Sequence, residues 1–311
     1  GVQGSELERS DTAILFSAES EWATRSQTLP SMKLNHWHDV RDWYRAFLNA
    51  GSRADIVPLK YDWSDYKTVV LPTVIMLSAE DTQRLADFAA AGGRVVIGYA
   101  TGLIDENFHT WLGGYPGAGD GLLREMLGIR GEEFNILGAE AEGEPSEIRL
   151  SSGAVTRLWQ NDVNVDGERA QVLATYEGEE ADEWELDGTA AITRNPYGSG
   201  ETYFVGCDLN VADLTQFVSA NIVEDSANVA NPADSDVLHT VRKSADATFD
   251  FYLPRGKKEI ALQGIEGEPI YLFQTEAGEQ AGSYTVHRNG VLVNCMSVLI
   301  QYQSAKLGIV T

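Results

Sequence analysis

Short apolar segments alternate with amphipathic helical segments along the first hundred residues, and this alternation limits the fold more than any other feature of the sequence. Parallel strands need long crossover connections, and helices in those crossovers cover both faces of the sheet. The strand-like segments are residues 12–17, 54–59, 68–71 and 94–99, and the predicted helices are residues 36–50 and the stretch from Ser78 to Gly92. The pattern predicts an α/β domain with a parallel sheet covered on both faces.

Residues at the helix ends support these two helices. Asn35 can cap the N-terminus of the first helix, and Gly51 stands where a left-handed residue commonly ends a helix. Ser78 and Asp81 form an acidic variant of a capping box at the start of the second helix, which ends before Gly92.

The following part of the sequence is richer in strands, which are linked by acidic turns. A short helix is predicted over residues 122–127, and a last helix over residues 209–223 with Asp208 as its N-cap. The predicted strands are residues 148–150, 155–159, 171–176, 190–193 and 202–205.

A polar segment separates this part from the C-terminal tail. Residues 224–236 contain Pro232 and are predicted to be a linker. The tail has short alternating segments, which predict a small antiparallel β domain. These segments are residues 248–253, 259–262 and 270–273.

The acidic charge of the chain limits its partners. The 311 residues include 23 Lys and Arg against 47 Asp and Glu, which gives a net charge of −24. Such a charge repels a phosphate backbone and an anionic lipid surface, so we expect no nucleic acid and no membrane partner. The two cysteines, Cys207 and Cys295, stand far apart and alone, which indicates reduced thiols rather than a metal site or a disulfide framework.

The N-terminal residues lack the pattern of a signal peptide, and no apolar run approaches the roughly 18 residues of a membrane span. We therefore expect a cytoplasmic protein. Gly1 to Gly4 stand where an initiator methionine would be, so we expect residues 1–10 to be an expression scar or an interdomain linker.

The most informative short motif is GYATG at residues 98–102, directly after the last strand-like segment of the alternating series. This part resembles class I glutamine amidotransferases, in which a G-x-C-x-G turn carries the cysteine nucleophile. Gly98 and Gly102 match the turn, but Ala100 occupies the nucleophile position, and a methyl group cannot attack an acyl carbon. The late His-x-Glu pair is absent too, since neither His239 nor His287 belongs to one. Amide hydrolysis is therefore not expected.

The first predicted helix carries two histidines and a wide apolar stripe. His36 and His38 point about 200° apart on a helix and cannot share a metal ion there, so no metal site is expected. The stripe is about 140° wide, broader than the roughly 100° of a typical surface helix. It consists of Trp37, Val40, Trp43, Tyr44, Phe47 and Leu48. Two interpretations stay open: a deeply buried core helix, or a contact of Trp43, beside His36, with another domain or subunit.

Three further patterns could be mistaken for sites. The glycine-rich residues 113–121 lack the spacing and the lysine of a phosphate-binding loop, and they predict a rigid loop. The adjacent acids are expected at solvated surfaces rather than as glycosidase carboxylates. They are Asp105 with Glu106, Glu132 with Glu133, and Glu179 with Glu180. The scattered tryptophans Trp63, Trp111, Trp159 and Trp184 leave a sugar-binding platform open as an alternative.

Five segments carry a more specific resemblance: LNHWHDVRDWYRAFLNAG, ADIVPL, YKTVVLPTVIMLSAEDTQRLADFAAAGGRVVIGYATGLIDEN, GGYPGAGDGLLREMLGI and NPYGSGETYFVG. In order and spacing they are similar to the trimerisation domain of family 42 β-galactosidases, over residues 11–223. Residues 237–293 look, more loosely, like the small C-terminal β domain of that family. The resemblance stops after Val293.

The resemblance implies an amidotransferase-like, flavodoxin-like three-layer domain over residues 11–235 and a small antiparallel β domain over residues 236–311. It also implies a parent enzyme that removes terminal β-galactose by a retaining mechanism, with both catalytic glutamates in an N-terminal barrel. Such a barrel needs about 250 residues and is not in this sequence, so no catalytic residue is expected here.

The partners implied are the barrel of the same parent chain, two further copies in a homotrimer, and the β-galactoside that the parent enzyme binds. No cofactor is expected. Two alternatives remain: a stand-alone amidotransferase-like enzyme with relocated chemistry, and a carbohydrate-binding module.

Overall fold

The structure is a computed structural model that describes residues 4–26, 29–136, 147–166, 169–183, 185–223 and 237–245, together with the strands of the C-terminal part. The chain divides into two compact units. The larger comprises Ser10–Phe47 and Arg53–Ala220, and the smaller comprises Gly1–Arg9, Leu48–Ser52 and Asn221–Thr311. The predicted linker, residues 224–236, lies outside the described residues.

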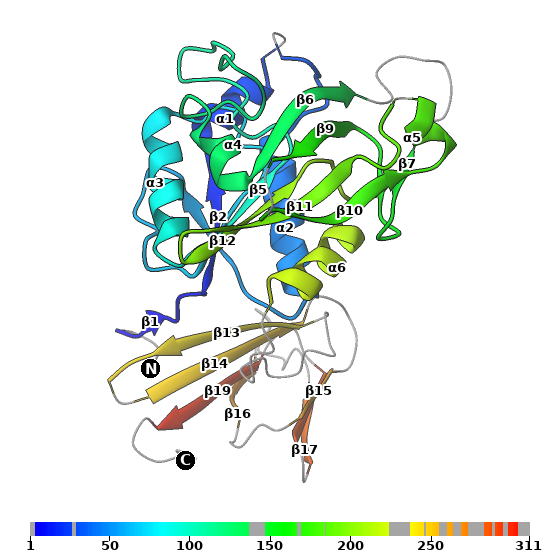
Figure 1. Ribbon diagram of the computed structural model, residues 1–311. Helices are drawn as coiled ribbons and strands as arrows, with labels where there is room; N and C mark the ends of the chain where they lie inside the picture. Colours follow the sequence, from blue (N-terminus) through cyan, green and yellow to red (C-terminus); the bar gives the residue numbers. More distant parts are fainter. Residues whose placement is uncertain are drawn as a thin grey trace. The chain divides into compact units, whose positions relative to one another are not determined.

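The larger unit is built on one mixed sheet (Figure 1). One half is parallel and has the order β3-β2-β4-β5-β12. These strands are β2 (Thr12–Phe16), β3 (Asp55–Pro58), β4 (Thr68–Leu71), β5 (Arg94–Gly98) and β12 (Gly200–Val205). The prediction of an α/β domain with a parallel sheet is confirmed for this half.

The other half of the sheet is antiparallel, since each strand from β12 outward runs opposite to its neighbour. From β12 it continues through β11 (Ala190–Tyr197), β10 (Gln171–Glu177), β7 (Ile148–Leu150) and β8 (Val155–Thr156). Strand β9 (Trp159–Val165) pairs with β11, and β6 (Ile129–Ile136) pairs with β9. The fold is therefore mixed, whereas the sequence pattern predicted a parallel sheet.

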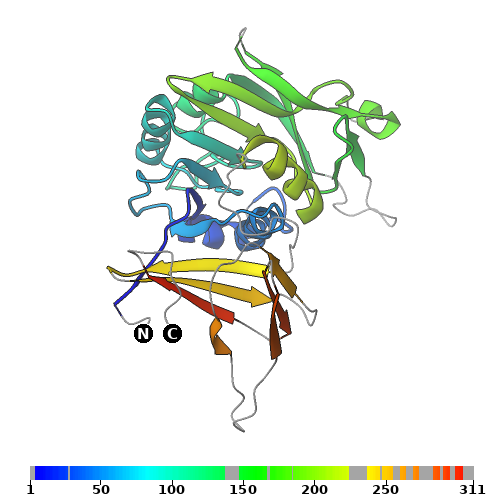
Figure 2. The ribbon, with the colours of Figure 1, turned by 90° about the horizontal axis from the view of Figure 1, so that it is seen from below.

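Helices cover both faces of the parallel half (Figures 1 and 2). Ile97 of β5 and Phe204 of β12 share one core with Leu85 of α3 (Ala79–Ala90). The neighbouring Tyr203 faces the other way and meets Phe217 of α6 (Val211–Asn221) edge-on at 5.9 Å between ring centroids. Phe217 in turn contacts Trp43 of α2 (His36–Asn49). Helices α2 and α6 thus lie opposite α3.

The helix ends agree with the sequence. Asn35 Oδ1 accepts a hydrogen bond from the His38 amide at 2.9 Å, which caps α2, and Gly51 beyond its end has φ +74°. Ser78 Oγ accepts from the Asp81 amide at 3.1 Å at the start of α3. The short helix α4 (Leu122–Leu127) has the predicted bounds.

The predicted cap of α6 was wrong. Asn210 caps this helix, since its Oδ1 accepts from the amides of Ala212 at 2.9 Å and Asp213 at 3.0 Å. Asp208 lies too early in the chain to reach that helix end. Its Oδ1 instead accepts from the amides of Leu158 at 2.8 Å and Trp159 at 2.7 Å, where β8 turns into β9.

The turn held by Asp208 explains a second difference. Residues 155–159 were predicted as one strand, but the chain bends at residues 157–158 and forms the separate strands β8 and β9. Three elements of the larger unit were not predicted at all: α1 (Ala18–Thr24), the eight-residue β6, and the acidic helix α5 (Glu179–Glu183). The two helices are too short to show a clear apolar period.

The smaller unit contains antiparallel strands. The pairing order is β1 (Glu6–Leu7), β13 (Val237–Lys243), β14 (Ala247–Pro254), β19 (Val298–Gln303) and β16 (Pro269–Leu272). A separate group pairs β15 (Ile260–Gln263), β18 (Gly290–Asn294) and β17 (Ser283–His287). Part of residues 1–10 therefore forms a strand in this unit. No helix of the described residues is long and apolar enough to span a bilayer.

We expect Asp208→Ala to lower the free energy of unfolding of the larger unit by about 2–3 kcal/mol, because it leaves several backbone N–H groups without their acceptor. Asn210→Ala removes an ordinary helix cap and should cost about 1 kcal/mol. All seven tryptophans belong to the larger unit, so urea denaturation followed by tryptophan fluorescence measures both losses. A smaller loss for Asp208→Ala than for Asn210→Ala would contradict this assignment.

Candidate functional site

The GYATG turn, residues 98–102, follows β5 and has a constrained backbone. Gly98 closes the strand, and a Cβ there would lie 3.1 Å from the carbonyl oxygen of Leu71 on β4. Gly102 has φ +71°, and a Cβ there would lie 2.7 Å from Leu123. Ala100, between them, has φ +55°, a left-handed conformation that costs energy for any residue with a side chain. The strain therefore falls on the residue that the sequence motif places at the nucleophile position.

Ala100 is completely buried. Tyr115 lies beside the Ala100 backbone and the Asn161 side chain, and burial raises the pKa of the Tyr115 hydroxyl well above its ordinary value. An amide and a neutral phenol cannot take a proton from an attacking group at neutral pH. The side chain at the centre of the GYATG turn is therefore the buried methyl group of Ala100, and neither Tyr115 nor Asn161 beside it can act as a general base.

His36, at the start of α2, is a satisfied core residue. Its Nδ1–H donates to the Pro72 carbonyl at 2.7 Å, and its Nε2 accepts from the Ser17 amide at 2.9 Å, so the ring is a neutral tautomer. Its ring stacks on Phe16 at 5.3 Å between centroids. Burial lowers the pKa of His36 to about 4. His38 is exposed, and no three metal-binding side chains gather anywhere in the described residues.

Trp43 is also in the core, 4% exposed, with its ring edge-on to Phe217 at 5.9 Å. The buried positions of His36 and Trp43 favour the core interpretation of these two residues over the interface interpretation. Among the described residues, the exposed tryptophans are Trp22, at 70%, and Trp37, at 40%. Sequence reasoning missed Trp22 because α1 itself was not predicted.

The sugar-platform alternative was wrong for two of its tryptophans. Trp63 is 3% exposed with the Arg84 guanidinium 4.6 Å above its ring, and Trp159 is fully buried against Phe134. Trp111 is half-buried and donates to the Leu77 carbonyl at 3.2 Å. Trp184 lies outside the described residues. The three described rings stabilise the core and cannot form one exposed stacking surface.

An enclosed carboxyl group joins α2 to the carboxyl ends of β4 and β5. Asp39 Oδ2 accepts hydrogen bonds from the Tyr99 hydroxyl at 2.9 Å and from the Thr73 hydroxyl. Burial, reinforced by the charges of Asp208 and Asp42, raises the pKa of Asp39 to about 7 despite these two hydrogen bonds. Nothing in the sequence indicated this site, because an aspartate in the first turn of a helix is common at exposed positions.

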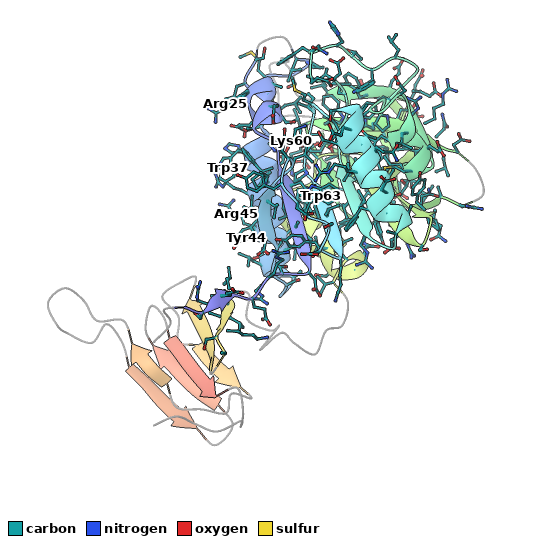
Figure 3. The ribbon with its side chains drawn as sticks, turned by 90° about the vertical axis from the view of Figure 1, so that its left-hand side faces the viewer. Arg25, Trp37, Tyr44, Arg45, Lys60 and Trp63 are labelled. Atoms are coloured by element: carbon teal, nitrogen blue, oxygen red, sulfur yellow. The ribbon has the colours of Figure 1, made fainter. Side chains whose placement is uncertain are left out.

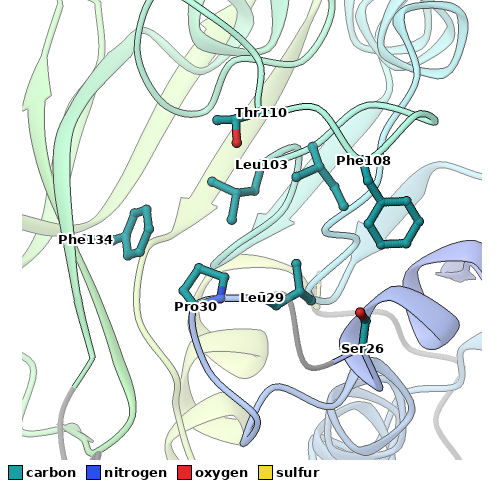
Figure 4. A pocket seen from close by; sticks show the side chains of 8 residues that line it. Ser26, Leu29, Pro30, Leu103, Phe108, Thr110 and Phe134 are labelled. Carbon is teal, nitrogen blue, oxygen red and sulfur yellow. The ribbon is translucent and has the colours of Figure 1, made fainter.

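An apolar groove of about 760 Å³ opens beside the loop that follows the GYATG turn. Its apolar walls come from Leu29, Pro30, Leu103, Ile104, Phe108 and Phe134, and Ser26 and Thr110 complete it. Figure 4 shows Phe134 on one side and Phe108 on the other, with Pro30 and Leu103 between them. None of these lining side chains is an acid or a base, so the groove is suited to binding an apolar segment.

The larger unit is an α/β domain with an alanine at the centre of the GYATG turn and a groove lined by apolar and hydroxyl side chains. Comparison with known proteins specifies the family. The β-galactosidase trimerisation domain matches residues 10–229. The chain therefore belongs to the trimerisation-domain family of family 42 β-galactosidases.

Two relatives illustrate this membership. β-Galactosidase BbgII of Bifidobacterium bifidum is 34% identical over 297 residues, and a β-galactosidase of Arthrobacter is 31% identical over 286 residues. The matches cover 94% and 92% of this chain but 41% and 39% of those proteins. The chain thus spans about two fifths of the length of the curated relatives it matches.

Solved structures share the fold. The β-galactosidase from Rahnella sp. R3 gives a TM-score of 0.76 at 23% identity, covering 96% of this chain and 42% of that one. The β-galactosidase Gan42B from G. stearothermophilus gives a TM-score of 0.75 at 21% identity, covering 95% and 40%.

We expect Asp39→Asn to change how stability depends on pH. The folded-state pKa of Asp39, about 7, lies above the unfolded value of about 3.9, so its contribution to stability is fully present below pH 4 and is lost as the pH rises through 7. The substituted side chain of this variant still has an oxygen that accepts hydrogen bonds from Thr73 and Tyr99, but it cannot ionise. The variant should match the parent at pH 4 and exceed it by on the order of 3 kcal/mol at pH 8.

Urea denaturation at a series of pH values measures this difference. Asp11→Asn, at the opposite end of the parallel strands, is the matched control, because Asp11 pairs with Lys67 at an exposed position. Equal pH dependence in the parent and in Asp39→Asn would show that Asp39 is ionised in the folded protein at pH 5.

Proposed function

We propose that this chain is the assembly part of a β-galactosidase: it joins three copies of the enzyme through the larger unit and contributes no catalytic residue. The observation that carries the proposal is the match to the trimerisation domain over residues 10–229. The groove without ionisable lining and the alanine at the GYATG turn support it, because both are suited to contact rather than to bond cleavage.

The fold assigned in this proposal is a class I glutamine amidotransferase-like, flavodoxin-like three-layer domain over residues 11–235, followed by a small antiparallel β domain over residues 236–311. Helices α2 and α6 on one face, α3 on the other, and a strained turn after β5 support the first assignment. A cytoplasmic location is part of the proposal, and the free thiol of buried Cys207 supports it.

The chemistry of the proposed parent enzyme belongs to a separate catalytic barrel of the same chain. Two glutamates of that barrel would hydrolyse terminal β-galactosides with retention of configuration, one as acid and base and the other as nucleophile. Ala100 supports the assignment of the chemistry to a separate barrel, because the turn that holds a nucleophile in the amidotransferases has a methyl group here.

We expect the purified chain to have three times its monomer mass of 34.0 kDa in light scattering at tens of micromolar. We also expect it to release no chromophore from a chromogenic β-galactoside, because both catalytic carboxylates are assigned to the barrel. A monomer at this concentration contradicts the assembly role. Hydrolysis that persists through successive purification steps contradicts the assignment of the chemistry to a separate barrel.

A further inference from the structure

One half of the α2 surface is covered by the sheet and α6, and the other half is not. Residues His36, Val40 and Phe47, spaced four and seven apart, are all fully buried. Trp37, Arg41, Tyr44 and Arg45 lie about 80–180° around the helix from His36 and are half-buried or exposed. The unusual width of the apolar stripe in the sequence thus comes from aromatic side chains that this copy of the domain does not bury.

Helix α1 extends this uncovered half. Glu21 Oε2 accepts from the Trp37 amide at 3.0 Å, and Glu21 Oε1 pairs with Arg25, so the two helices adjoin. Trp22 lies one turn before Arg25 and therefore shares its side of α1. We define the outer face as Trp22, Arg25, Trp37, Arg41, Tyr44 and Arg45. Figure 3 shows the labelled Arg25, Trp37, Tyr44 and Arg45 together along the outside of α1 and α2.

The outer face is cationic in a strongly acidic chain. Three of its six side chains are arginines and none is acidic, although Arg25 and Arg45 also pair with Glu21 and Asp42, whereas the whole chain carries −24. Exposed tryptophan, tyrosine and arginine are the residue types enriched at protein interfaces, where lysine and glutamate are depleted. The composition therefore points to a protein partner with a negative surface.

A negative surface of that kind occurs on the same domain. Seven acids and no base lie in residues 177–187, at the end of β10 and through α5, and all seven are exposed. They are Glu177, Glu179, Glu180, Asp182, Glu183, Glu185 and Asp187. No ion pair joins any of them to a basic side chain in the described part of the chain. We define them as the acidic segment.

The outer face and the acidic segment cannot meet within one copy. Helices α1 and α2 lie in the chain between β2 and β3, at the parallel end of the sheet, whereas α5 packs on β10 and β7 at the antiparallel end. A cyclic trimer requires two different complementary surfaces on each copy, because each subunit contacts its two neighbours through different patches. Two surfaces of opposite charge, at opposite ends of one sheet, meet this requirement.

We propose that the outer face of one copy binds the acidic segment of the next copy, head to tail, around a threefold axis. The proposal rests on the proposed trimer and specifies its contact. Trp22 and Trp37 supply apolar area, and the arginines pair with carboxylates that have no basic partner in the described part of their own copy. Because rim charges are screened by salt, the trimer should weaken as ionic strength rises.

The test is a charge reversal with a rescue. Arg41→Glu with Arg45→Glu should weaken trimerisation about tenfold or more in sedimentation velocity. Adding Glu180→Arg with Glu183→Arg to the same chain should restore it. The matched control, Lys67→Glu with Arg130→Glu, reverses two exposed charges outside the outer face and should leave the trimer unchanged. Circular dichroism and thermal melting verify that every variant is folded.

The outcomes separate this contact from the trimer itself. A parent chain that is monomeric overturns both the proposed function and this contact. A parent trimer that survives the reversal of Arg41 and Arg45 overturns the contact and leaves the proposed function standing. A reversal that dissociates the trimer without rescue by Glu180→Arg and Glu183→Arg overturns the acidic segment as the partner.

Discussion

Strands β2, β4, β5 and β12 run parallel, and a parallel sheet must be covered on both of its faces. This constraint determines most of what surrounds it. It requires α2 and α6 on one face and α3 on the other, and it buries Val96 as completely as its neighbours Val95 and Ile97. It also sends the chain out of β5 through a tight turn, since Gly98 lies against the backbone of β4. The site at Ala100 and the groove beyond it depend on that turn.

The same constraint places polar side chains near the sheet, where they form hydrogen bonds within the chain. His36 is held neutral by hydrogen bonds to Pro72 and Ser17, and Asp39 links α2 to Tyr99 and Thr73. Both sit at the carboxyl edge of the parallel strands, where α/β enzymes place their substrates. Here these two side chains are engaged in hydrogen bonds within the chain.

Local signals in the sequence predicted the parallel half and its helix caps, because Asn35, Ser78 and Gly51 act through neighbouring residues. The spacing of glycines around Ala100 indicated a constrained turn for the same reason. Asp208 was assigned to the wrong element, since its acceptor role depends on a bend between two strands 50 residues earlier in the chain. Helix α1, the groove and the raised pKa of Asp39 also escaped prediction. The groove and the raised pKa of Asp39 arise where segments distant in the sequence come together in the fold. No local sequence pattern indicates such long-range contacts.

Contact between copies is the proposed work of this domain, with the chemistry carried elsewhere in the parent enzyme. Native mass spectrometry of the intact chain tests this role most directly, because it resolves the number of copies in each assembly without reference to molecular shape. The expected result is a dominant species at three times 34.0 kDa. A spectrum with only the 34.0 kDa monomer, at a concentration of tens of micromolar and low ionic strength, would contradict it.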